Sequence, residues 1–331
     1  MRARVSVLLP VRDAEATLPS ALASVARQTL REWECVVVDD GSRDASAAIA
    51  RRFAEGDPRF RVLARPAEGL VAALEAGRAA CEAPIVARMD ADDLMHRERL
   101  AAQAPALEGD PALAAVGCHV RLFPRRGLLA GIREYESWLN SLRTPEEIAR
   151  DAFVECPVAH PALAIRRERL SYRDRGWPED YDLVLRLLEA GERIGVVPRR
   201  LLLWRDGPAR LSRTSAAYSL ERFAACKAEF LARGFLAGTD EYHLWGFGPT
   251  GKLLRTALLA HGKRPARIFE LHPRRLGNVI DGAPILPPDA LAAAPRLPVI
   301  VCIAGLAARA AARADLAARG LAEGREYVCA A

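Results

Sequence analysis

The sequence predicts an α/β protein made of two units, each built around a mostly parallel sheet. Short apolar runs rich in β-branched residues alternate with helical spacing between residues 5 and 93. The same alternation restarts after residue 240. The 331 residues, 51% of them hydrophobic, suffice for one domain of ordinary enzyme size and a smaller one.

The first unit begins with a buried strand at Val5–Pro10, an apolar run that ends in proline. Further buried strands are expected at 34–38, 60–63 and 85–89. The helices expected between them cover 18–28, 44–53 with Asp44 as N-cap, and 70–81. Acidic segments follow the second and fourth strands directly. In parallel sheets covered on both faces, ligands bind beyond the carboxyl ends of the strands, so both segments are expected at one functional edge.

The middle of the chain is less regular. Its expected strands are 116–123, 158–165 and a run at 194–203 broken by Pro198, and its expected helices are 145–152 and about 181–190. A helix at 216–233 precedes the second unit, whose expected elements are strands at 242–245, 267–271 and 299–304 and a helix at 252–260. The predicted domains are therefore 1–215, a helical connector at 216–239, and a small domain at 240–331.

The charge and cysteine content narrow the function classes. The net charge of +6 comes almost entirely from arginine, which fits either a compositional bias or affinity for phosphates and anionic membranes. The chain has no Lys/Arg block with interleaved aromatic residues, so its charge pattern does not indicate a nucleic-acid partner. Seven scattered cysteines without a CxxC pair favour a reducing cytoplasm over disulfides or a zinc site. With no leader peptide and no apolar run of membrane-spanning length, we expect a cytoplasmic protein with at most peripheral contact at the inner membrane face.

The most informative motif is the acidic turn after the fourth strand. Asp90, Asp92 and Asp93 place three mutually repelling carboxylates in one turn. Mg²⁺ or Mn²⁺ would relieve that repulsion and could bridge a diphosphate. The alternative is a solvated acidic turn that caps a helix. Asp40, after the second strand, could accept hydrogen bonds from a nucleobase or serve only as a turn residue.

Taken in order, four segments resemble family 2 glycosyltransferases of the GT-A fold: 5–11, Ser24-Val25 with Gln28-Thr29, 36–42 with Asp44, and 90–93. The resemblance covers about residues 1–215. It implies an inverting transfer from a nucleoside diphosphate-sugar, with a UDP-sugar as the expected donor. The acceptor would be a glycan, a lipid-linked sugar or a small molecule in cell-surface glycan biosynthesis. A homodimer is one possible assembly.

The resemblance also assigns site residues by position. The donor-nucleotide contacts would be Pro10, Val11, Asp13, Glu15, Asp40, Asp90 and Ala91. The metal would be held by Asp92 and Asp93, and Asp180 would be the general base. The acceptor side would include His160, Arg166 and Glu179.

Two departures from the family pattern matter. The aromatic-Asn pair after the first proline is replaced by Arg12-Asp13, which affects the early nucleotide contacts. The QxxRW signature and the membrane helices of processive members are missing, so single transfers are expected. Glu179 and Asp180 also have a structural alternative, since acidic residues compensate the dipole at a helix N-terminus.

The second unit carries Gly246, Gly248 and Gly251 in a GxGxxG pattern between a strand and a helix, and Glu270 ends the next strand. This resembles small Rossmann-type domains that bind nucleotides. The alternative is that the glycines only permit a tight turn and close helix packing. Two other functions for the whole chain remain open at this point, a nucleotidyltransferase and a nucleotide-binding regulatory protein.

Overall fold

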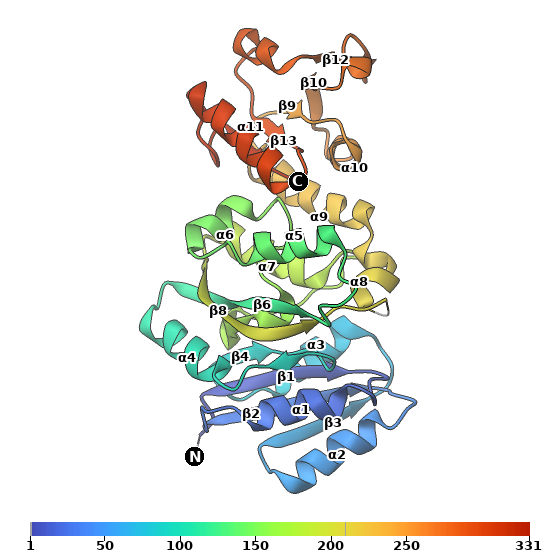
Figure 1. The fold of residues 1–331 in the computed structure, drawn as a ribbon, viewed down its shortest axis with the longest axis vertical. Coiled ribbons are helices and arrows are strands. Elements are labelled where there is room, and N and C mark those ends of the chain that lie inside the picture. The colour runs from blue at the N-terminus through green and yellow to red at the C-terminus, as the bar shows by residue number, and fades with distance from the viewer. Residues whose placement is uncertain (1, 209) are drawn as a thin grey trace. The chain divides into compact units, whose positions relative to one another are not determined.

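The computed structural model describes residues 2–208 and 210–331. The chain forms two compact units with interleaved boundaries. The first contains residues up to 148, 158–174 and 182–208, and the second contains 149–157, 175–181 and the residues after 208. Each unit has its own largely parallel sheet with helices, which confirms the predicted fold class (Figure 1). The domain limits at 215 and 239 stay predictions.

The first unit is built on a sheet of order β3-β2-β1-β4-β7-β6-β8-β5. The strands β1 to β4 are mutually parallel where they pair, and β7 runs antiparallel to both of its neighbours, β4 and β6. Their bounds are β1 Val5–Val11, β2 Trp33–Asp40, β3 Phe60–Arg65, β4 Ile85–Arg88, β5 Leu94–Met95, β6 Leu113–Phe123, β7 Ala164–Arg166 and β8 Arg193–Arg205. The carboxyl ends of β2, β1 and β4 therefore lie at one edge.

Chain direction fixes which helices cover this part of the sheet. The chain steps from β1 to β2 to β3 and then returns past β1 to β4. Right-handed crossovers put α1 (Leu18–Ala26) and α2 (Ser46–Gly56) on one face and α3 (Leu70–Ala80) on the other, as Figure 1 shows. The strand order reverses between β1 and β4, and this reversal is where such sheets bind ligands.

The middle of the chain differs from the prediction. The strand expected at 158–165 is wrong: a 3₁₀ turn at His160–Ala162 precedes the short strand β7. Pro161 has no N–H to contribute to a ladder, which explains the late start of β7. Pro198 does not break β8. Instead the register against β6 shifts there, from Cys118↔Val197 to His119↔Arg200.

Several helices were not predicted or have different bounds. α4 (Arg99–Gly109) contains Pro105, which hid its helical pattern, and α5 (Ala130–Leu139) was missed. The helix expected at 216–233 is a 3₁₀ turn at Ala216–Tyr218 followed by α9, because Ser219 caps a new helix start. The remaining helices are α6 Pro145–Asp151, α7 Glu179–Glu189, α8 Leu211–Thr214, α9 Leu220–Arg233, α10 Pro249–Leu259 and α11 Leu306–Ala318. Further 3₁₀ turns lie at Arg167–Arg169, Pro273–Arg275 and Pro288–Ala293.

The second unit has a sheet of order β11-β12-β10-β9-β13-β14, parallel except for the pair β11 and β12. Its strands are β9 Glu241–Trp245, β10 Arg264–Phe269, β11 Val279–Ile280, β12 Ala283–Leu286, β13 Val299–Val301 and β14 Tyr327–Cys329. The order reverses between β9 and β13, as in doubly wound folds. Helix α9 belongs to this core, since Ala228 and Leu231 are buried with Leu244 and Ile300.

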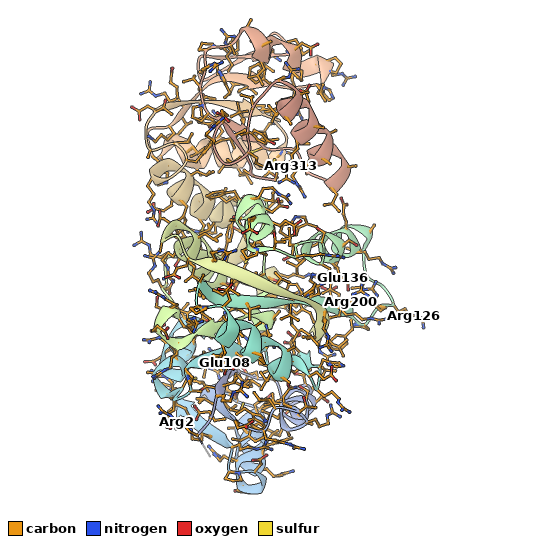
Figure 2. All side chains as sticks on the ribbon, turned by 90° about the vertical axis from the view of Figure 1, so that its left-hand side faces the viewer. Arg2, Glu108, Arg126, Glu136, Arg200 and Arg313 are labelled. Carbon is orange, nitrogen blue, oxygen red and sulfur yellow. The ribbon has the colours of Figure 1, made fainter. Side chains whose placement is uncertain are left out.

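Many arginines are neutralised locally. Arg4 pairs with Glu108 at 2.5 Å, and Arg313 pairs with Asp151 at 2.6 Å. Arg126, by contrast, projects from the loop before α5 (Figure 2). All seven cysteines are buried, and none of them forms a disulfide. Within residues 2–208 and 210–331, none of the helices combines the length and the apolar character needed to span a membrane.

Candidate functional site

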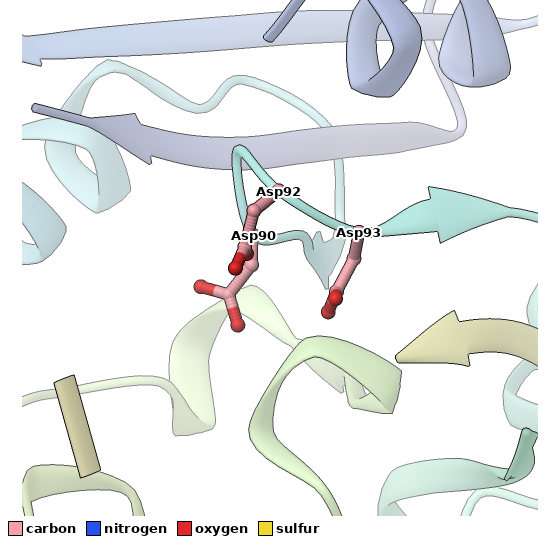
Figure 3. Close-up of side chains that lie close together, drawn as sticks. All are labelled: Asp90, Asp92 and Asp93. Carbon is pink, nitrogen blue, oxygen red and sulfur yellow. The ribbon is translucent and has the colours of Figure 1, made fainter. Parts of the chain in front are cut away.

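The acidic turn lies at the reversal point of the first sheet. It follows β4 directly, and the Met89 N–H donates to the Leu8 carbonyl of β1 at 3.0 Å. Ligand oxygens of Asp90, Asp92 and Asp93 all lie within 4.8 Å of one another. Figure 3 shows the three carboxylates directed to the same side of the turn. Asp93 is buried, whereas Asp90 and Asp92 are half-buried, so the cluster is accessible to an ion or ligand through these two.

Two arginines fix the turn. Arg88, the last residue of β4, places Nη1 2.5 Å from an Asp90 oxygen. Arg205, at the end of β8, donates its backbone N–H to Asp93 at 2.7 Å and its Nε–H to the Asp92 carbonyl at 2.7 Å. The Arg205 guanidinium also stacks on the Phe123 ring, 4.5 Å from its centroid. The turn is therefore held from the strand before it and from a strand more than 100 residues later in the chain.

Sequence reasoning missed both arginines as part of the site. An available signal for Arg88 was a charged residue inside an otherwise apolar run that reads as a buried strand, since arginine is almost never fully buried without a partner. For Arg205 the sequence offers no comparable signal. No local pattern could pair it with Asp93, because that contact depends on the position of β8 in the sheet.

Asp40 lies at the same sheet edge but is engaged by backbone. Its Oδ1 accepts from the Glu68 N–H at 2.8 Å, and its Oδ2 accepts from the Gly69 N–H at 3.0 Å. Arg12 approaches Oδ2 at 3.4 Å. The buried carboxylate thus anchors the loop that leads into α3, and any nucleobase contact would have to share these oxygens.

Asp13 and Glu15 form a reciprocal brace between the loops after β1 and β2. Asp13 Oδ1 accepts the Arg43 N–H at 2.7 Å, and the Asp13 N–H donates to Ser42 Oγ at 3.1 Å. Glu15 likewise accepts the Ala45 N–H and donates its own N–H to Asp44, both at 2.9 Å. Asp13 has a φ of 49°, a conformation that Asp tolerates better than most residues. The side chains of Pro10 and Val11 are buried at the end of β1, so it is their backbone that borders this edge.

The two predicted acceptor-side residues have different surroundings. His160 is buried, with Nε2 2.7 Å from Tyr172 Oη. Burial, and secondarily the charge of Arg88, hold the pKa of His160 well below its usual value, so this imidazole is neutral. Arg166 instead donates to the backbone carbonyls of Leu107 and Leu113, at 2.5 and 2.8 Å, and so ties β7 to the start of β6.

Glu179 and Asp180 start α7 and belong to the second unit by their contacts. Glu179 is buried, and the single O–H of Tyr218 donates to its carboxylate, whose two oxygens lie 2.9 and 2.8 Å from Oη. Asp180 is half-buried, and its Oδ1 accepts the Tyr181 N–H at 2.8 Å. Of the two, Asp180 carries the more accessible carboxylate, and the acceptor-side role of Glu179 stays a prediction.

The glycine loop of the second unit follows β9 and opens α10. A Cβ on Gly246 would lie 2.5 Å from the Cys302 carbonyl, and one on Gly251 would overlap the Gly246 carbonyl, so packing alone requires these two glycines. A Cβ on Gly248 would meet nothing within 4 Å, and packing does not explain that residue. Glu270 accepts from the Phe247 N–H and from Arg275, at 3.2 and 2.7 Å. Burial would raise the pKa of Glu270, but these and neighbouring hydrogen bonds lower it. Nucleotide binding here stays a prediction.

One surface hollow, of about 380 Å³, is lined by Arg2, Arg4, Glu82 and Arg167. These residues precede β1 and β4 or follow β7, so the hollow lies at the edge opposite the acidic turn. None of the predicted site residues lines this hollow, and the clustered carboxylates lie at the opposite edge of the sheet.

The first unit is an α/β domain with a clustered acidic turn at the reversal point of its sheet, the place where such sheets bind ligands. Residues 6–173, about half of the chain, match the Glycosyl transferase family 2 model. The chain belongs to this family, which confirms the predicted resemblance and decides against the nucleotidyltransferase alternative.

Two curated relatives show where the similarity lies. The chain is 31% identical over 209 residues to the amylovoran biosynthesis glycosyltransferase AmsE of Erwinia amylovora, covering 61% of this chain and 76% of that one. It is also 31% identical over 242 residues to the O-antigen biosynthesis protein RfbC of Myxococcus xanthus, covering 70% of this chain. The matched region is 18% of RfbC, so this chain spans about a fifth of that relative.

Solved structures share the fold. S. aureus TarS 1–349 in complex with UDP-GlcNAc has a TM-score of 0.56 at 19% identity, covering 79% of this chain and 72% of that one. The mannosyltransferase PcManGT of Pyrobaculum calidifontis, in complex with GDP-Man and Mn²⁺, has a TM-score of 0.50 at 21% identity, covering 79% and 70%. At these identities the similarity establishes a common fold.

Proposed function

We propose that this family 2 glycosyltransferase moves one sugar per encounter from a nucleoside diphosphate-sugar to an acceptor hydroxyl, with inversion at the anomeric carbon. The observation that carries the proposal is the accessible cluster of Asp90, Asp92 and Asp93 at the reversal point of the sheet. The names of AmsE and RfbC support an acceptor in polysaccharide or O-antigen synthesis. The complex of TarS with UDP-GlcNAc supports a UDP-sugar as donor.

The residues of the acidic turn fit a hard divalent cation. Carboxylate oxygens within 4.8 Å of one another are the ligands that Mg²⁺ and Mn²⁺ prefer. Asp92 and Asp93 would hold the ion, and Asp90, held by Arg88, would face the donor. The bound ion would stabilise the charge that develops on the leaving diphosphate.

The chain's own residues would carry out the remaining steps. The acceptor oxygen attacks the anomeric carbon as the bond to the diphosphate oxygen breaks, and one such displacement inverts the centre. Asp180, whose half-buried carboxylate lies in the first turn of α7, would take the proton from the acceptor hydroxyl. The brace formed by Asp13 and Glu15 would hold the loops that border the nucleotide.

The test is a transfer assay with UDP-, GDP- and dTDP-sugars, each with Mn²⁺ and with EDTA. We expect one donor to raise the melting temperature and to release its nucleoside diphosphate only with the metal. The anomeric proton coupling in the product, measured by NMR, should show the configuration opposite to that of the donor. Full transfer in EDTA would contradict the metal, and a retained configuration would contradict the single displacement.

Replacing the proposed base should affect catalysis more than binding. We expect Asp180→Asn to lower kcat about 100-fold, the lower end of the range for general bases, with donor affinity unchanged. Glu189→Gln, exposed at the other end of the same helix, is the matched control and should transfer normally. Near-normal kcat in Asp180→Asn would remove Asp180 from the mechanism.

A further inference from the structure

Arg88 is a buried cation that points into the acidic turn. Its side chain is 4% exposed, and its Nη1 lies 2.5 Å from an Asp90 oxygen. Its backbone is fixed on both sides: the Arg88 N–H donates to the Leu163 carbonyl at 2.9 Å, and Leu8 of β1 is its register partner. A buried guanidinium therefore sits at a fixed place beside the three carboxylates.

A second buried arginine stabilises that placement. Arg99 is fully buried and donates to the Arg88 and Leu163 carbonyls, at 3.0 and 3.2 Å. Its Nε–H donates to Gln103, which in turn donates to the carbonyls of Val116 and Ala162. Arg99 thus supports the backbone under Arg88. The charge of Arg99 also interacts with Asp93 and Asp90, but it is Arg88 that contacts the Asp90 carboxylate directly.

The short distance between Arg88 and Asp90 determines how strongly the arginine charge affects that carboxylate. A positive charge close to a carboxylate weakens the attraction between that carboxylate and a nearby cation, and solvent screening reduces this effect. Arg205, the other arginine at the turn, donates to a backbone carbonyl and stacks on Phe123. The charge of Asp90 is therefore offset mainly from β4.

We propose that Arg88 is a positioning residue of the donor site, which holds the Asp90 carboxylate in place and offsets one of the three negative charges of the turn. The inference rests on the proposed function. Arg88 thereby weakens the binding of a free cation and strengthens the binding of a nucleoside diphosphate with its cation. Loss of its charge should move the two affinities in opposite directions, whereas loss of structure would weaken both.

The experiment compares Arg88→Gln and Arg88→Lys with the wild-type chain at pH 7.5. Mn²⁺ binding without nucleotide is followed by the EPR signal of free Mn²⁺, and UDP binding at saturating Mn²⁺ by calorimetry. For Arg88→Gln we expect Mn²⁺ to bind about tenfold tighter and UDP about tenfold weaker. Arg88→Lys keeps the charge and should bind Mn²⁺ within threefold of wild type, with UDP affinity between the other two. Arg4→Gln, which loses an exposed pair of the same 2.5 Å distance at the opposite sheet edge, should change neither.

The outcomes separate this inference from the proposed function. A wild-type chain that binds no Mn²⁺ contradicts the proposed metal and the charge effect together. A wild-type chain that binds Mn²⁺, with unchanged or weaker Mn²⁺ binding in a folded Arg88→Gln, overturns the role of Arg88 alone. If Arg88→Gln does not fold, Arg88→Lys decides: wild-type UDP affinity in that variant overturns the positioning role.

Discussion

Asp92→Asn should lower kcat/KM for sugar transfer about 1000-fold, the largest loss that we expect from a single substitution. Asp92 is one of the two accessible carboxylates of the turn, and its backbone carbonyl is fixed by Arg205. An amide keeps the shape but removes a charged oxygen ligand, and removing one group that stabilises developing negative charge costs 100- to 1000-fold. Initial-rate kinetics over a range of Mn²⁺ concentrations measures the effect.

The control for this substitution is Asp110→Asn. Asp110 precedes β6 at the edge opposite the turn. Its carboxylate accepts a local hydrogen bond from the Ala112 N–H and lies 3.9 Å from the Arg193 guanidinium. We expect wild-type transfer in that variant. A loss of less than fivefold in Asp92→Asn would show that the turn does not bind the metal through this residue.

The free energy of unfolding should fall by up to about 3 kcal/mol between pH 6.5 and 5.5. His160, His119 and His243 are buried, and burial lowers the pKa of each below 6.5. Their Nε2 atoms contact Tyr172 Oη and the carbonyls of Leu142 and Pro295, respectively. Carbonyl contacts raise the pKa of His119 and His243, but burial outweighs them.

The free energy of unfolding falls with the pH because the unfolded chain takes up more protons than the folded chain. Below pH 6.5 the unfolded chain binds protons at these histidines while the folded chain keeps them neutral. The stabilisation is complete above the unfolded pKa and is lost as the pH falls toward the lowered folded pKa. Each histidine contributes a slope of about 1.4 kcal/mol per pH unit when the two states differ by a whole proton.

Urea unfolding at half-unit pH steps tests this expectation, with fluorescence and circular dichroism to follow both units. His119→Gln should flatten the pH dependence of the transition of the first unit, and His243→Gln that of the second. His272→Gln, an exposed histidine, should leave both slopes unchanged. A flat stability profile across this window would show that the folded histidines take up protons as readily as the unfolded ones.

The sequence predicted the elements that local pattern controls. The strands and helices from Val5 to Arg88 were correct within a few residues, because buried parallel strands are continuous apolar runs and the helices between them have their own period. The pattern failed where proline hides an element. Pro105 lies inside α4, and Pro161 precedes the late start of β7. In both places tertiary contacts, not the local sequence pattern, determine the secondary structure.

The amino-acid sequence alone was enough to predict the family and the acidic turn. Asp90, Asp92 and Asp93 are neighbours along the backbone and follow a recognisable strand. Only the tertiary structure decided what each carboxylate contacts. The register and order of the strands bring Arg205 to Asp93, the Glu68 N–H to Asp40, and Ser42 to Asp13. Such contacts join segments that lie 28 to 112 residues apart, and no local preference encodes them, because they form only when the crossovers have set the strands side by side.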